Sequence, residues 1–237
     1  ISAKAHHGHI LSAGFGILLL SIIGIGLFSG NRIAPLGWIG PYSLIVPVIY
    51  FVAMRLLFVY EKRRIAEFVK ERVEELRYEK ISTKTAVVNY VINAMVVIVA
   101  AIFLPKIGEG IAETTGLGQT FVGNIFIALS TSLPEVVVSI SAVKMGAVDL
   151  AVGNLFGSNI FNILILAIDD MFFVKGPILS FVNASHIISA LSAILMTAIA
   201  IIGLTYRSEK KKLLLAWDSI GILLVYIANI MLLYMLR

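Results

Sequence analysis

One long stretch without a charged side chain decides the fold class: ILSAGFGILLLSIIGIGLFSG, residues 10–30. As an α-helix, which rises about 1.5 Å per residue, it is long enough to cross the roughly 30 Å hydrocarbon core of a lipid bilayer. Six further apolar runs follow it along the chain. The pattern predicts an all-α membrane protein with seven transmembrane helices, at about 10–30, 38–60, 86–104, 119–145, 148–174, 178–205 and 213–236.

The composition agrees with a chain that is solvated by lipid. Of the 237 residues, 59% are hydrophobic and only 14% are charged, whereas a soluble domain carries about 25% charged residues. The short segments of alternating hydrophobicity that are typical of membrane barrels do not occur in the sequence. Because helices satisfy their backbone polar groups internally, they are the structure expected in lipid. There is no cysteine, which excludes disulfides and thiol catalysis.

The net charge of +5 reflects membrane topology rather than nucleic-acid binding. Fourteen of the basic residues lie on one side of the predicted helices, at Lys4, between Lys62 and Lys84, at Lys144 and between Arg207 and Lys212, and only four lie on the other side. This bias predicts that the N-terminus faces the cytoplasm of a multi-pass cell-membrane protein, and no nucleic-acid partner is expected. Segment 61–83, with apolar residues at helical spacing among its charges, is predicted to be an amphipathic cytoplasmic linker.

A short repeat lies on either side of this linker. Residues 9–13, HILSA, reappear at 186–190 as HIISA. The copies begin five predicted helices apart and therefore cross the membrane in opposite directions, which is typical of inverted-topology repeats in transporters. Three predicted helices lie between the linker and the second copy, whereas none precedes the first copy. We therefore interpret 1–60 as the last two helices of a truncated first repeat and 84–237 as a second five-helix repeat. A missing N-terminal half or a partner subunit is expected to complete the protein.

Polar residues gather in the fourth predicted helix, which contains ALSTSLPE at residues 128–135. Glu135 lies near the middle of this helix, where a carboxylate costs on the order of 3 kcal/mol. Thr131 is four residues earlier and so lies on the same face. Pro134 removes a backbone N–H and is expected to kink the helix and loosen nearby carbonyls. A carboxylate, hydroxyls and free carbonyls together form an oxygen site that suits Na⁺ or Ca²⁺.

The fifth predicted helix carries a second polar stretch, GNLFGSNIFN at residues 153–162. Gly153 and Gly157 form a small-xxx-small pair that allows another helix to approach closely. Ser158 and Asn162 are also four residues apart and present two oxygen atoms on one face. Each feature alone is typical of helix packing. On helices that are consecutive in the chain, they favour a cation site together with Glu135.

These two stretches resemble the sodium/calcium exchanger family. The α-repeat motif of that family reads G-T-S-L-P-E, followed on the next helix by G-N-x-x-G-S-N-I-x-[N/D]. Residues 128–162 match it closely, with Ser130 in place of the first glycine. The resemblance implies a ten-helix fold in which two α-repeats face each other and exchange Ca²⁺ for Na⁺ by alternating access. Both ions would be transported substrates, and no cofactor is expected.

The resemblance also implies roles for individual residues. It implies Ca²⁺ binding by Glu135 and Thr131, Na⁺ binding by Thr131, Ser158, the Ala128 carbonyl and Glu135, and a centre lined by Asn162 and Ser132. The form T-S-L-P-E resembles the sodium-coupled branch of the superfamily. Asn162 stands where an aspartate would add a carboxylate, so potassium dependence is not expected.

Other functions remain open from the sequence. The chain can belong to an antiporter that uses protons or transports another divalent cation, to a half-size subunit that requires a partner, or to a membrane protein that keeps the motif only for packing. No nucleophile–base pair or metal triad stands out, so an enzyme is not expected. A single membrane carboxylate balances the charge of one Na⁺ but not of Ca²⁺, so this chain alone is not expected to transport Ca²⁺.

Further ionisable residues are interpreted as solvated rather than functional: Asp169 and Asp170 near the outer interface, Glu109 and Glu113 in an outer loop after Pro105, and His6, His7 and His9 in a terminal segment without partner ligands.

Overall fold

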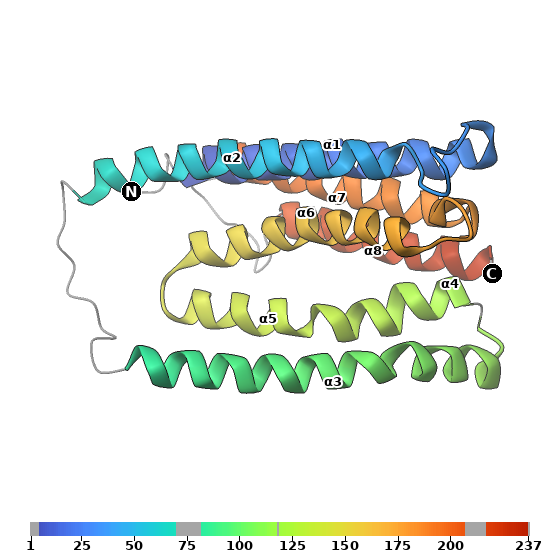
Figure 1. Cartoon of the computed structure of the whole chain (residues 1–237). Coiled ribbons are helices and arrows are strands. Elements are labelled where there is room, and N and C mark those ends of the chain that lie inside the picture. Colours follow the sequence, from blue (N-terminus) through green and yellow to red (C-terminus); the bar gives the residue numbers. More distant parts are fainter. Residues whose placement is uncertain (1–4, 70–81, 118, 207–216, 237) are drawn as a thin grey trace. The chain divides into compact units, whose positions relative to one another are not determined.

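Helices make up the regular structure of the chain (Figure 1). The computed structural model describes residues 5–69, 82–117, 119–206 and 217–236. Its α-helices are α1 (Ala5–Ser29), α2 (Tyr42–Val69), α3 (Thr83–Thr115), α4 (Gln119–Val122), α5 (Ala128–Lys144), α6 (Val148–Phe172), α7 (His186–Thr205) and α8 (Trp217–Met235). A π-helical segment, Gly123–Ile127, joins α4 to α5. Short 3₁₀ turns follow α1 at Gly30–Arg32 and precede α7 at Ile178–Ser180.

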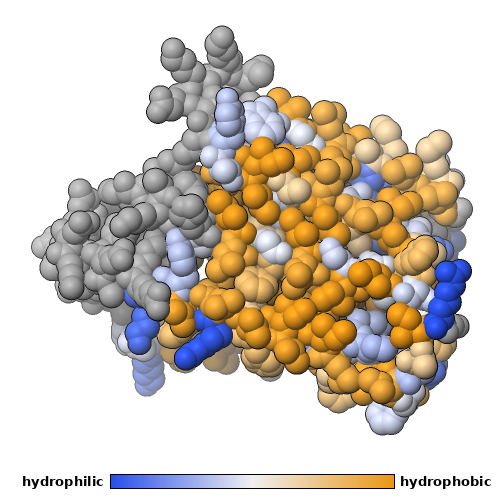
Figure 2. All heavy atoms as spheres, turned by 90° about the horizontal axis from the view of Figure 1, so that it is seen from above, coloured by the Kyte–Doolittle hydropathy of each residue, from blue (hydrophilic) through white to orange (hydrophobic). Residues whose placement is uncertain are grey.

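Seven of these helices are long and apolar enough to cross a membrane, which confirms the predicted number of spans. The spans are Gly8–Ser29, Tyr42–Tyr60, Thr83–Thr115, Ile125–Lys144, Val148–Phe172, His186–Thr205 and Trp217–Met235. The surface seen in Figure 2 is largely apolar, and large side chains of α2 such as Val48, Phe51 and Phe58 are exposed. Lipid solvates such a surface, whereas water does not. The chain is a multi-pass membrane protein.

The chain divides into two compact units, and the division falls inside α5. The first unit contains Ile1–Tyr60 and Leu133–Arg237, and the second contains Glu61–Ser132. In the first unit α1 packs against both α6 and α7, and α7 packs against α8. Leu19 and Ile23 of α1 share one apolar core with residues of α2 and α6. The helices that precede the linker therefore pack directly against helices that follow it.

The contacts of α1 give its direction relative to the other helices of the first unit. His9 near the start of α1 contacts the start of α6, and a Cβ at Gly26 near its end would lie 2.9 Å from Cδ1 of Leu179, which follows the end of α6. α1 thus runs parallel to α6 and opposite to α7 (Figure 1). The two copies of the HI-x-SA sequence lie in α1 and α7, which cross in opposite directions. The repeat itself and the proposed domain boundaries stay predictions.

Asp170 is buried, so its interpretation as a solvated interfacial residue is wrong. Its side chain is 0% exposed and accepts hydrogen bonds from the backbone N–H of Gly40 at 2.8 Å, the hydroxyl of Tyr42 at 2.9 Å and the backbone N–H of Ile178 at 2.6 Å. The Tyr42 hydroxyl in turn accepts the N–H of Leu179 at 3.1 Å. Chain segments between helices leave N–H groups without helical partners, and here a carboxylate accepts them in place of water. Asp169, in contrast, is exposed.

His9 is not part of an unpartnered terminal segment either. Helix α1 begins at Ala5, and His9 is only 8% exposed. Its Nε2 atom lies 3.3 Å from Oδ1 of Asp149 in the first turn of α6. The ring also lies near Gly153, where an added Cβ would be 3.7 Å from Cε1 of the histidine. The first glycine of the small-xxx-small pair therefore faces α1.

Helix α3 extends beyond its predicted end, so Glu109 and Glu113 lie on a helix and not in a loop. α3 continues through Pro105 and ends at Thr115, before Gly116, whose φ of 69° suits the end of a helix. Gly108 and Ala112, one turn apart, are the buried residues of this extension. A Cβ at Gly108 would lie 2.6 Å from Cδ1 of Ile127. This packing continues the helix past the end of its apolar run.

The predicted linker is described only in part. Residues 61–69 prolong α2 without a break, and residues 70–81 lie outside the described residues. The sixth predicted run also differs from the structure, because residues 178–185 form a 3₁₀ turn and a connecting segment before α7 begins. The fifth run agrees closely with α6.

We expect Asp170→Ala to lower the stability of the protein strongly. The substitution leaves three donors without their acceptor, and each buried unsatisfied group costs about 1–3 kcal/mol. The thermal unfolding midpoint of the purified protein in detergent measures the effect. Asp169→Ala, one residue away and exposed, is the control and is expected to change stability by no more than about 0.5 kcal/mol. Equal effects of the two substitutions would contradict a structural role for the network.

Candidate cation site

A helical hairpin positions the candidate site. α5 ends at Lys144 and α6 begins at Val148, with a tight turn at residues 145–147 in which Gly146 has a φ of 79°. The N–H of Ala147 closes this turn on the carbonyl of Ala142 at 2.8 Å. Residues at similar distances before and after such a turn face each other. Glu135 and Ser158 are such a pair, so the spacing of the two motif halves brings them together.

Glu135 is held on one side only. The hydroxyl of Ser158 donates to its Oε1 at 2.9 Å. Its Oε2 is buried and has no hydrogen-bond partner within the described part of the chain. Nor does any ion pair among these residues join Glu135 to a basic side chain. A buried carboxylate oxygen without a donor is costly, which leaves this atom available to a cation.

Asn154 is a member of the site that the sequence did not single out. Its Nδ2 donates to the backbone carbonyl of Glu135 at 3.3 Å and lies 3.3 Å from Oγ of Ser139. The spacing of these polar residues in the sequence could have indicated this contact. Asn154 is four residues before Ser158, and Ser139 is four residues after Glu135, so each pair shares one helix face.

The first turn of α5 brings two predicted ligands together. The hydroxyl of Thr131 donates to the carbonyls of Ile127 at 3.0 Å and of Ala128 at 3.1 Å. The hydroxyl and carbonyl oxygens that the motif assigns to Na⁺ are thus neighbours. The second compact unit contains Ala128, Thr131 and Ser132, whereas the first contains Glu135 and Ser158.

The irregular part of this helix lies before the motif. α5 continues through Pro134 without interruption, while the preceding residues Gly123–Ile127 are π-helical. A single π-helical turn inside a transmembrane segment often accompanies a functional site. The sequence predicted irregular winding at Pro134, whereas the structure has it about two turns earlier, at Gly123–Ile127.

Two predicted residues are not drawn into the hydrogen bonds of the site. Ser132 and Asn162 have exposed side chains. Asn162 follows Ser158 by one turn of α6 and lies on the same face of the helix. Its role and that of Ser132 stay predictions.

The donor set favours a hard cation over a transition metal. Among the described residues there is no group of three His, Cys, Asp or Glu side chains that could hold a metal ion. One carboxylate combined with neutral hydroxyl and carbonyl oxygens is the ligand chemistry of Na⁺, and of Ca²⁺ if further oxygens are supplied.

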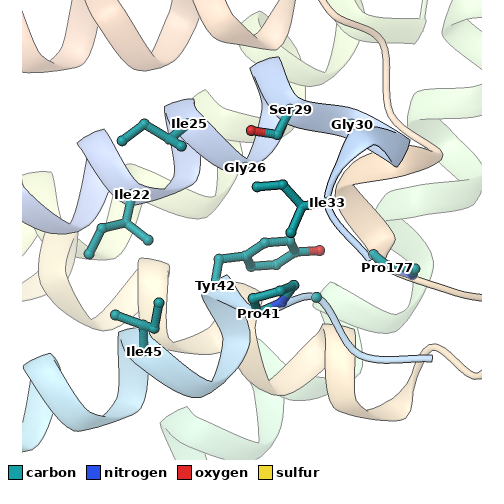
Figure 3. Close-up of a pocket in the computed structure, with 11 residues that line it drawn as sticks. Ile22, Ile25, Gly26, Ser29, Gly30, Ile33, Pro41, Tyr42, Ile45 and Pro177 are labelled. Atoms are coloured by element: carbon teal, nitrogen blue, oxygen red, sulfur yellow. The ribbon is translucent and has the colours of Figure 1, made fainter. Parts of the chain in front are cut away.

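A separate cavity in the first unit has the wrong chemistry for a cation. It has a volume of about 200 Å³ and lies beside the end of α1 and the start of α2. Its walls are mainly isoleucine and proline side chains: Ile22, Ile25, Ile33, Ile45, Pro41 and Pro177 (Figure 3). The lining contains no carboxylate, so this cavity is apolar and distinct from the site at Glu135.

Comparison with known proteins identifies the family. The family model described as sodium/calcium exchanger protein matches residues 85–235, more than half of the chain. The chain belongs to the sodium/calcium exchanger family. Both halves of the motif lie in the matched region.

Exchangers from distant organisms are among its relatives. Sodium/calcium exchanger MaX1 of Methanosarcina acetivorans is 30% identical over 145 residues, which cover 61% of this chain and 39% of MaX1. Inner membrane protein YrbG of Escherichia coli is 43% identical over 56 residues, covering 24% and 17% of the two chains. Human sodium/potassium/calcium exchanger 5 is 34% identical over 73 residues, covering 31% and 14%. The matched segments thus span less than half of each relative's own length. No solved structure matches the chain.

We expect Ser158→Ala to destabilise the protein even in the absence of cations. It removes the donor to Oε1 of Glu135 and leaves the carboxylate without a side-chain partner among the described residues, which costs about 1–3 kcal/mol. Thermal unfolding in sodium- and calcium-free buffer measures the loss. The control is Ser141→Ala, because the exposed Ser141 hydroxyl bonds to the carbonyl of Val137 in its own helix. If both variants unfold at the same temperature, Ser158 does not hold the carboxylate.

Proposed function

We propose that this chain is part of a membrane antiporter that exchanges Ca²⁺ for Na⁺ by alternating access. The single observation that carries the proposal is the buried Oε2 of Glu135, which has no protein donor among the described residues. A carboxylate inside a membrane helix is tolerated when an ion offsets its charge. Membership of the sodium/calcium exchanger family supports the choice of these ions.

The proposed ligands follow from the motif and the hairpin. Glu135 supplies the charge, and Ser158 both orients it and offers a hydroxyl oxygen. The motif adds Thr131 and the Ala128 carbonyl as further proposed ligands, and these two oxygens are neighbours within their own unit. Together they replace part of the hydration shell of Na⁺. Ser132 and Asn162 are proposed to line the path at the centre.

Charge balance supports a second set of ligands from outside the described residues. One carboxylate neutralises one Na⁺, but Ca²⁺ bound to it would leave a net positive charge in a low-dielectric region, which is unfavourable. We therefore propose that a second carboxylate comes from a missing N-terminal half or a partner subunit. The matched segment spans 39% of MaX1, which is consistent with a half-site.

The proposed topology follows the distribution of basic residues. Most of them lie on the side of Lys4 and of linker 61–83, so this side is proposed to face the cytoplasm. Lys144 at the end of α5 lies on the same side of the predicted topology. Cytoplasmic ions would then enter at the turn between α5 and α6 and move along these two helices to Glu135.

Glu135→Gln is expected to abolish stabilisation of the protein by Na⁺. For wild type, Na⁺ at ten times its dissociation constant stabilises the folded state by about 1.4 kcal/mol. The neutral amide cannot balance the ion, so the shift of the unfolding midpoint between NaCl and choline chloride of equal concentration disappears. Glu109→Gln, on the exposed face of α3, is the control and keeps the shift. A Glu135→Gln variant with the full shift would overturn the proposed site.

Transport measurements test the remaining parts of the proposal. Liposomes that contain this chain alone are expected to take up no ⁴⁵Ca²⁺ when an outward Na⁺ gradient is imposed to drive uptake, because the second carboxylate is lacking. Uptake by the chain alone that Glu135→Gln abolishes would overturn the half-site. In liposomes of the complete protein, uptake that is insensitive to the Na⁺ gradient would instead indicate proton coupling.

A further inference from the structure

Asn154 binds the backbone of the helix that carries Glu135. Its Nδ2 lies 3.3 Å from both the carbonyl oxygen of Glu135 and Oγ of Ser139. A backbone carbonyl only accepts hydrogen bonds, so the nitrogen and not the oxygen of the amide faces α5. The –NH₂ group has two protons and can serve both acceptors at once. The surroundings of Asn154 thus fix the direction of its amide.

The helix needs support at this point. Pro134 directly precedes Glu135 inside α5 and has no N–H, so the carbonyl of Ser130 loses its helical donor. The turn that leads into Glu135 is therefore held by one backbone hydrogen bond fewer than a regular helix. The hydrogen bond from Asn154 connects Glu135, at the C-terminal end of this turn, to α6.

Asn154 and Ser158 hold different parts of the same residue. Ser158 bonds to the carboxylate of Glu135, whereas Asn154 bonds to its main chain. Because they are four residues apart, both project from one face of α6. A ligand must be held within about 0.5 Å of its productive position for a site to work well. A side chain meets this condition only when its backbone is also fixed.

We propose that Asn154 is a positioning residue of the cation site. It fixes the main chain at Glu135 through the Glu135 carbonyl and the Ser139 hydroxyl, and it does not touch the ion. This inference rests on the proposed function, because the property that it controls is cation affinity at Glu135. Loss of the groups that orient metal ligands lowers metal affinity by about 10- to 100-fold.

Asn154→Leu tests the proposal, because leucine has the same branched shape, with methyl groups in place of the amide oxygen and nitrogen, and no donor. We expect the Na⁺ concentration for half-maximal thermal stabilisation to rise about tenfold or more. Ser139→Ala is expected to have a smaller effect, since the bond to the Glu135 carbonyl remains. The double variant is expected to be no weaker than Asn154→Leu alone, because both changes act through one group. Asn93→Leu, which replaces an exposed asparagine of α3, is the control and leaves the midpoint unchanged.

Two further readouts separate positioning from packing. Asn154→Gln keeps the amide and is expected to recover part of the affinity that Asn154→Leu loses. Hydrogen–deuterium exchange of residues 130–139 is expected to be faster in Asn154→Leu than in wild type. A variant that unfolds at a lower temperature but keeps the wild-type Na⁺ midpoint and exchange rate would overturn the proposal. If Asn154→Leu does not fold, Asn154→Gln and Ser139→Ala decide by the same measurements.

Failure of the proposed function gives a different result. In that case Na⁺ stabilises neither wild type nor Glu135→Gln, and the exchange measurement still decides about Asn154. Faster exchange at 130–139 in Asn154→Leu would support its hold on this turn. Unchanged exchange would overturn it.

Discussion

A carboxylate inside a lipid bilayer must find partners other than water, and this requirement gives two acidic residues of the chain opposite characters. Asp170 accepts three hydrogen bonds from protein donors and is fully enclosed. Its charge is dispersed within the fold, so it joins chain segments without needing a ligand. Glu135 receives one donor at Oε1 and none at Oε2 among the described residues. The number of hydrogen-bond donors around each carboxylate distinguishes a structural acid from a candidate ion ligand. Its position within an apolar run of the sequence does not.

Much of the architecture could be predicted because lipid imposes a simple rule on sequence. Long apolar runs with few charged residues predicted all seven spans, and the run at 148–174 matches α6 closely. The meeting of Glu135 and Ser158 could also be predicted, since both belong to motif halves on either side of a short turn. Such local relations depend on helical periodicity and chain length alone.

The errors concern residues whose environment is set by distant parts of the chain. Burial of Asp170 depends on Gly40 and Tyr42, which are far away in sequence, and no periodicity indicates that contact. His9 was misjudged in the same way, because its partner Asp149 begins another helix. Helix α3 continues past Pro105 since Gly108 packs against Ile127. Proline and charge signal a helix end only when no such packing opposes them.

The π-helical segment Gly123–Ile127 has a consequence for how sequences in this region can vary in length. Adding or removing one residue in an α-helix turns everything beyond it by about 100° around the axis. The π-helical turn contains one residue more than an α-helical turn. It therefore determines the direction around the helix axis in which the side chain of Glu135 projects, relative to the residues before the turn. A deletion here would restore regular winding and yet misalign that side chain with whatever the preceding residues contact. Insertions and deletions should therefore be rarer in this short segment than its lack of charged or catalytic side chains would suggest.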